Sequence, residues 1–242
     1  MEASFERVKP MSNHRYIIWD FDGTLGERTG MWSGTLLEVL HANGHGKQLA
    51  AKDLRPFLAA GFRWHNAHST NPPRTSPDLW WSELEPIFQR AFLEGAKVPL
   101  AESQHLAREV RRKYVDPAKW TLFSDASQTL GTLAEDGWQH ILLTNHVPEL
   151  TSLLAALSIH RYFTAVFNSA DTGIEKPHVQ AFENVRSSLT GHPTLWMIGD
   201  SFTADVEGAE SAGIPAILVR RRHPSAKRYA EDLHGVRSIL DG

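Results

Sequence analysis

The sequence predicts an α/β protein, in which a doubly wound parallel sheet is interrupted by an inserted helical domain. Three observations support this fold class. An apolar, β-branched run, Tyr16–Trp19, ends abruptly in Asp-Phe-Asp-Gly-Thr, which is typical of a buried strand followed by a turn. Strand-like character then disappears for roughly ninety residues. From Ser124 onward, strands and helices alternate, which indicates parallel strands joined by helical crossovers.

Apolar residues at helical spacing divide the insertion into four helices. The first begins near Trp32 and stops at Asn43-Gly44, the second covers Leu54–Phe62, the third starts at Ser76-Pro77, and the fourth ends at Tyr114, before Asp116-Pro117. Tryptophans at helical spacing are usually core residues, so Trp64, in the expected loop 63–77, is the best tryptophan candidate for a ligand cleft. We expect a core domain of residues 1–25 and 118–242 and a helical domain of residues 26–117.

The elements of the second half follow from short apolar runs and from helix stop signals. Gly137 and Gly213 each end a helical pattern, because glycine readily adopts the left-handed conformation that closes a helix. The expected helices are 126–135, 148–157, 179–189 and 205–212, and the expected strands are 140–143, 165–167, 195–198 and 216–219.

Composition excludes several classes of function. The chain has 242 residues, with 41% hydrophobic and 22% charged residues, as in an ordinary globular protein. Its net charge of −3 argues against a nucleic acid polymer or an anionic membrane as partner. The absence of cysteine excludes disulfides, thiol catalysis and zinc–thiolate sites. We expect a cytoplasmic monomer or homodimer, whose native start is Met1 or Met11.

Reactive side chains follow the expected strands, at the positions where the active sites of such proteins usually lie. Carboxyl ends of parallel strands meet at one edge of a sheet, so we expect these side chains to converge there. Two carboxylates that lie two residues apart on a strand repel each other, and a divalent cation relieves this repulsion. The candidates are Asp20 and Asp22 after the first strand, Thr144 and Asn145 after the strand 140–143, Lys176 before the helix at 179, and Asp200 and Asp205 after the strand 195–198.

This set of residues resembles the four motifs of the haloacid dehalogenase (HAD) superfamily of hydrolases. The motifs are Asp20-Phe21-Asp22-Gly23-Thr24, then Thr144, then Lys176-Pro177, and then Gly199-Asp200-Ser201 with Asp205. The resemblance covers the whole chain, because the helical insertion after the first motif is similar to the cap of that superfamily. It implies a Rossmann-like core with an inserted α-helical cap.

The resemblance also implies a role for each candidate. Asp20 is expected to be the nucleophile that forms an aspartyl-phosphate, and Asp22 the general acid and then the general base. Mg²⁺ is expected on Asp20, Asp200 and the main-chain carbonyl of Asp22. The remaining roles are Asp205 as the residue that holds Lys176 or a metal-bound water, and Thr144, Asn145 and Lys176 as ligands of the phosphoryl group.

The second aspartate narrows the reaction. Members of the superfamily that attack carbon do not keep it, so Asp22 favours phosphoryl transfer and a phosphatase acting on a small phosphorylated metabolite. Phosphosugar mutases share both aspartates and stay an alternative, as does a non-catalytic binding protein that kept the fold. The motifs are similar to those of phosphoglycolate phosphatase-like and nucleotidase-like members and do not distinguish between them.

Four weaker candidates lie beside the motifs. His146 and His178 follow the second and third motifs, but in a chain with 13 histidines coincidence is the better interpretation. Arg28 lies where the insertion begins and is a candidate contact for a substrate anion. The run Arg220–His223 is typical of a solvated charged segment.

Overall fold

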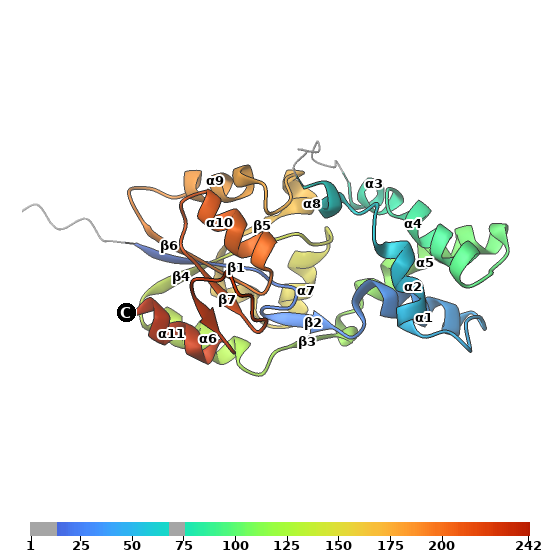
Figure 1. Ribbon diagram of the computed structural model, residues 1–242, viewed down its shortest axis with the longest axis horizontal. Helices are drawn as coiled ribbons and strands as arrows, with labels where there is room; N and C mark the ends of the chain where they lie inside the picture. Colours follow the sequence, from blue (N-terminus) through green and yellow to red (C-terminus); the bar gives the residue numbers. More distant parts are fainter. Residues whose placement is uncertain (1–13, 68–75) are drawn as a thin grey trace, which may run out of the picture.

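A six-stranded parallel sheet lies at the centre of the core, which forms one half of the molecule in a computed structural model that describes residues 14–67 and 76–242 (Figure 1). This confirms the predicted α/β fold. The expectation for the start of the chain, and residues 68–75 of the expected loop, lie outside the described residues. In spatial order the strands are β5 (Phe163–Asn168), β4 (Trp138–Thr144), β1 (Arg15–Trp19), β6 (Thr194–Gly199), β7 (Ala216–Val219) and β8 (Tyr229–Ala230).

Strand β1 lies between β4 and β6, and its position fixes where the reactive residues emerge. Trp19 is in register with Leu142 on one side and Ile198 on the other. Consecutive residues of a strand point to opposite faces, and both faces of β1 are buried, with Ile17 in one apolar cluster and Ile18 in the other. The residues that follow these three strands therefore meet at one edge of the sheet.

Helices cover both faces of the sheet, as expected for a doubly wound fold. On one face, α6 (Ala126–Glu135), α7 (Leu150–Ala156) and α11 (His234–Leu240) share an apolar cluster with β1, whereas α9 (Val179–Ser187) and α10 (Gly208–Ser211) pack on the other. Shorter elements complete the core: α8 (Ser169–Thr172) and the helical turns η4 (Pro117–Lys119), η5 (His160–Tyr162) and η6 (Phe202–Glu207).

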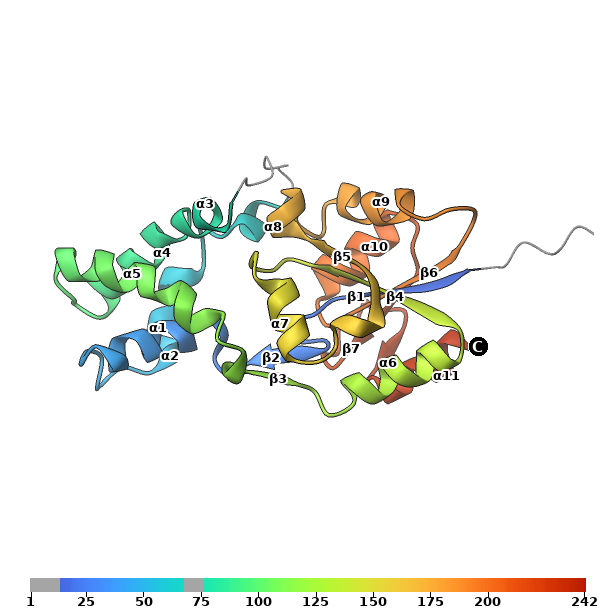
Figure 2. The same cartoon turned by 180° about the vertical axis from the view of Figure 1, so that it is seen from behind.

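The inserted helices gather at one end of the molecule, away from the sheet (Figure 2). They are α1 (Met31–Ala42), α2 (Ala51–Leu54), α3 (Pro77–Ser82), α4 (Glu85–Arg90) and α5 (Leu100–Tyr114), with the turns η1 (Arg55–Leu58), η2 (Arg63–Asn66) and η3 (Ala91–Gly95). Among the described residues, no helix combines the length and the apolar character needed to cross a bilayer.

Two of the predicted inserted helices were wrong in extent. The second is not continuous over Leu54–Phe62, because α2 ends at Leu54 and the chain continues as the 3₁₀ turn η1, which contains Pro56. The third is divided into α3 and α4, with Pro86 in the first turn of α4. Proline lacks the N–H that a helix interior requires, so both divisions occur at proline. Ser76 caps α3, as the Ser-Pro signal predicts.

An antiparallel ribbon that the sequence did not predict connects the two parts. It consists of β2 (Gly26–Arg28) and β3 (Trp120–Leu122), and strands this short carry no periodicity to detect. The buried Arg28 donates to Glu38 and to the carbonyl of Lys113, both at 3.1 Å. The side chain therefore fastens the ribbon to the inserted helices.

A second junction joins the inserted helices to the core beside α7. Glu149, which precedes α7, accepts a hydrogen bond from the indole N–H of Trp81 at 3.1 Å and pairs with Arg111 at 2.7 Å. Trp81 and Arg111 belong to α3 and α5. The cap-like helices thus contact the core through the ribbon and through Glu149.

Candidate active site

Asp20 lies directly after β1 and is surrounded by hydrogen-bond donors. Its side chain accepts hydrogen bonds from the hydroxyls of Thr24 and Thr144, each at 3.1 Å, and from the ammonium of Lys176 at 2.8 Å. Its main-chain N–H continues the sheet by bonding the carbonyl of Ile198. Donors of this kind stabilise the carboxylate anion and fix one carboxylate of the site in place.

Gly23 allows the first motif to approach the fourth, and Gly199 leaves room for Asp205 within the fourth motif. Gly23 has a φ of +83°, and a Cβ there would lie 2.7 Å from Cγ of Asp200. A Cβ on Gly199 would lie 2.6 Å from Cβ of Asp205. Neither position accepts a side chain, because real Cβ atoms do not come this close to another atom.

Lys176 is the buried cation of the site. Its ammonium bridges Asp20 Oδ1 at 2.8 Å and Asp205 Oδ1 at 2.6 Å. Burial lowers the pKa of Lys176, but the two aspartates outweigh it and raise the pKa above its ordinary value. Asn145 holds the main chain of Lys176, donating to its carbonyl at 2.9 Å and accepting from its N–H at 2.8 Å, and its contact with phosphate stays a prediction.

Three buried carboxylates lie close enough to hold one cation. Ligand atoms of Asp20, Asp200 and Asp205 lie within 4.8 Å of one another. Burial, followed by the charge of Asp20, raises the pKa of Asp200 to about 7, and burial raises the pKa of Asp205 to about 6. An oxygen-only set whose negative charge exceeds the positive charge of Lys176 and Arg221 fits a hard divalent cation.

The grouping of carboxylates differs in one respect from the predicted ligand set. It includes Asp205, which was expected to act on Lys176 or on a metal-bound water, and which does contact Lys176. The second carboxylate oxygen of Asp205 accepts from the N–H of Ser201 at 3.0 Å. Arg221 Nε lies 3.2 Å from Asp200 Oδ2 and supplies positive charge from the other side.

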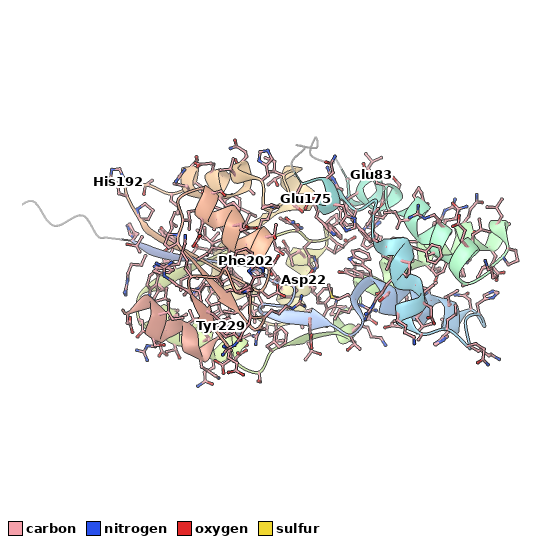
Figure 3. All side chains as sticks on the ribbon, viewed as in Figure 1. Asp22, Glu83, Glu175, His192, Phe202 and Tyr229 are labelled. Atoms are coloured by element: carbon pink, nitrogen blue, oxygen red, sulfur yellow. The ribbon has the colours of Figure 1, made fainter. Side chains whose placement is uncertain are left out.

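Asp22 has a different environment from Asp20. Burial, with the charges of Asp20 and Asp200 next in importance, raises the pKa of Asp22 well above its ordinary value. Its Oδ1 lies 3.6 Å from Nε2 of His146. In Figure 3 it lies on the side of the core that faces the inserted helices. A raised pKa favours the protonated form of this carboxyl group, which is the form that can donate a proton.

His146 was interpreted as a coincidence from sequence, and the structure places it at the site. Burial lowers its pKa to about 4, and its ring contacts those of Phe21 and Trp120. Its position directly after Thr144-Asn145 was the one feature of the sequence that indicated a place at the site. The aromatic residues around it come from distant segments of the chain. His178 is different, because its ring accepts from the N–H of Gln180 at the start of α9.

The seven predicted site residues line one cavity of about 390 Å³. The inserted part contributes Met31, Trp32, Trp64 and Tyr114 to its wall. Trp64 was the expected tryptophan, whereas Trp32 was wrongly assigned to the core and is only partly buried. Trp80 and Trp81 are core residues as predicted. Arg28 does not line this cavity.

The interpretation of Arg220–His223 as a solvated segment was wrong for Arg220, whereas Arg221 is exposed as predicted. Arg220 donates to the carbonyl of Thr24 at 2.8 Å and to Asp125 at 2.8 Å, so it secures the turn that follows the first motif. Arg221 reaches Asp200, as described above. The run follows β7 and therefore begins at the edge of the sheet where the site lies. The charges of the run alone do not reveal this position.

The fold and the site together define a hydrolase with the core of the haloacid dehalogenase superfamily. The model of the haloacid dehalogenase-like hydrolases matches residues 14–213, and the chain belongs to that family. The solved structure of the magnesium-bound HAD-hydrolase YfnB from Bacillus subtilis has the same fold, with a TM-score of 0.75 and 19% sequence identity. The superposition covers 96% of this chain and 100% of that protein's chain.

Two curated relatives share part of the chain. Pyrimidine 5'-nucleotidase PynA from Streptococcus pneumoniae is 32% identical over 122 residues, covering 49% of this chain and 51% of that protein. Phosphoglycolate phosphatase from Salmonella typhi is 32% identical over 125 residues, covering 50% of this chain and 49% of that protein. The chain thus spans about half the length of these two relatives.

Proposed function

We propose that the protein is a Mg²⁺-dependent phosphatase that hydrolyses a small phosphomonoester through an aspartyl-phosphate on Asp20. The observation that supports this most strongly is the contrast between the two neighbouring aspartates. Asp20 accepts hydrogen bonds from Lys176 and two threonine hydroxyls, whereas the pKa of Asp22 is raised by burial. Two carboxyl groups with such different environments suit two roles, a nucleophile and an acid.

The reaction proceeds in two steps. An oxygen of Asp20 attacks phosphorus, the bond from phosphorus to the alcohol oxygen breaks, and Asp22 gives its proton to that oxygen. Water then attacks phosphorus and gives a proton to Asp22, which releases phosphate and restores Asp20. Thr144 and Lys176 stabilise the negative charge of the transferring group, and Asn145 and Asp205 hold Lys176 in position.

Asp20 and Asp200, with the main-chain carbonyl of Asp22, would hold the cation, and Asp205 lies within reach. When bound, Mg²⁺ supplies positive charge that offsets the charge of the phosphoryl oxygens. Helices of residues 26–117 act as the cap, which covers the substrate and excludes water. The two curated relatives differ in their named substrates. They therefore support the hydrolysis of a phosphate ester, but they do not indicate which alcohol the ester contains.

The test is phosphate release from p-nitrophenyl phosphate with Mg²⁺, compared with Asp20→Asn. We expect turnover in the native protein, none after chelation, and none in the variant. Rapid quenching with a labelled substrate should place an acid-stable, hydroxylamine-labile label on Asp20. Label on another residue overturns the mechanism. Isomerisation of a phosphosugar without free phosphate favours a mutase, and the absence of any turnover favours a binding protein.

A further inference from the structure

The cavity has an aromatic wall opposite the carboxylates. Within the described ranges, the inserted part contributes Met31, Trp32, Trp64 and Tyr114 to this wall, and none of them carries a charge. The core contributes the aspartates, Lys176 and Thr144. The phosphoryl end and the alcohol end of a substrate therefore meet very different surfaces.

Stacking holds the rings of this wall in place. Trp32 stacks on Tyr114 with centroids 3.8 Å apart, and Trp64 stacks on Phe62 at 4.5 Å. Trp32 and Trp64 are themselves 6.1 Å apart. Met31 adopts a φ of +44°, a conformation that costs energy for a residue with a side chain. A rigid wall of this kind presents flat apolar surface at a low entropic cost.

Among the residues that the structure describes, a second anionic group on the substrate would find little positive charge in this cavity. Lys176 is engaged by Asp20 and Asp205, and Arg28 is engaged by Glu38 and the carbonyl of Lys113. An unpaired buried charge is strongly unfavourable. Arg55 lines a neighbouring cavity of about 410 Å³ that shares Met31, Trp32 and Trp64 with the first, so it lies beyond the aromatic wall.

We propose that the alcohol of the substrate carries an uncharged planar ring, such as the base of a nucleoside monophosphate, which stacks against the wall formed by Trp32 and Trp64. This rests on the proposed phosphatase function and specifies its substrate class. Stacking a base on an aromatic side chain contributes a large part of binding in other proteins and tolerates many rings, because every base has a π-face.

The experiment compares uridine 5'-monophosphate with ribose 5-phosphate. Both are primary alkyl phosphates of the same sugar, so the base is the main difference between them. We expect the native protein to prefer the nucleotide in kcat/KM by about tenfold to a hundredfold. Trp64→Ala should remove most of this preference, mainly through KM, and Trp64→Phe should restore part of it. Trp196→Phe, in β6, is the matched control and should leave the preference unchanged.

Other outcomes separate failure of this inference from failure of the phosphatase assignment. Release of phosphate from ribose 5-phosphate as readily as from the nucleotide overturns the inference and leaves the phosphatase intact. If Trp64→Ala loses the same factor in kcat/KM on both substrates, the wall has only a structural role, and this result also overturns the inference. A preference for phosphoglycolate that is lost in Arg55→Ala points to an anionic alcohol instead. No release from any substrate overturns the phosphatase itself.

Discussion

The buried carboxylates predict that the stabilisation of the fold by Mg²⁺ depends on pH. The pKa of Asp200 is raised from 3.8 to about 7, by burial and then by the charge of Asp20. A raised pKa means that the proton favours the folded state, so this contribution to stability is complete below pH 3.8 and is lost as the pH rises through about 7. A divalent cation replaces the proton and restores the stability.

The size of the effect follows from competition between proton and cation. The full shift corresponds to about 4 kcal/mol, which is the penalty on the folded protein at high pH without a cation. At pH 5 the proton must leave before the cation binds, so saturating Mg²⁺ should stabilise the fold by about 3 kcal/mol less than at pH 8. For a chain of this size, that difference is roughly 6 to 12 °C in Tm.

The assay is thermal unfolding followed by circular dichroism at pH 5 and pH 8, with chelator or with Mg²⁺ at constant ionic strength. Asp200→Asn should be more stable than the native protein at pH 8 without a cation, and it should gain little from Mg²⁺. Glu231→Gln, an exposed residue away from the cluster, is the matched control. Equal stabilisation of the native protein by Mg²⁺ at both pH values would refute the reasoning.

Three further predictions concern single residues. Asp22→Asn should slow turnover of alkyl phosphates by ~10²–10⁴-fold in steady-state assays, and much less with p-nitrophenyl phosphate, whose leaving group needs no proton. Gly199→Ala should displace Asp205 and lower the free energy of unfolding by about 1–3 kcal/mol, measured with urea. Arg220→Met should cost about 1.5–3 kcal/mol at pH 7. Although burial acts in the other direction, hydrogen bonds from Arg220 keep the pKa of Asp125 below 3.8, so the part of this loss that comes from Asp125 should disappear as the pH falls through that lowered pKa, and the part that comes from the carbonyl of Thr24 should remain. A constant loss contradicts it.

The convergence of the site could be predicted because it depends on the topology of the sheet. Asp20 and Asp200 each follow a strand, Thr144 ends one, and β1, β4 and β6 are neighbours in register. Apolar runs reveal such strands, and parallel pairing brings their ends to one edge. The sequence therefore specifies these residues without knowledge of any side-chain contact.

The wall of the cavity could not be predicted in the same way. Trp32 lies at helical spacing like a core residue, and only the packing of the inserted helices shows that part of its ring faces the carboxylates. The contacts of His146 and Arg220 likewise join segments distant in the sequence. Ribbon strands β2 and β3 have three residues each, which is too short for a periodic pattern.

The environment of Asp22 links the position of the inserted helices to the chemistry. Its pKa is raised chiefly by burial. Burial also raises the pKa of the hydroxyl of Tyr114, the last residue of α5, and the nearby charge of Asp22 raises it further. Because α5 belongs to the inserted part and also holds Glu149 through Arg111, movement of these helices away from the core would admit water to Asp22. Water stabilises the carboxylate and would lower its pKa. In the proposed mechanism, Asp22 would therefore be protonated when the helices lie against the core, which is also when the aromatic wall would surround the alcohol that receives the proton.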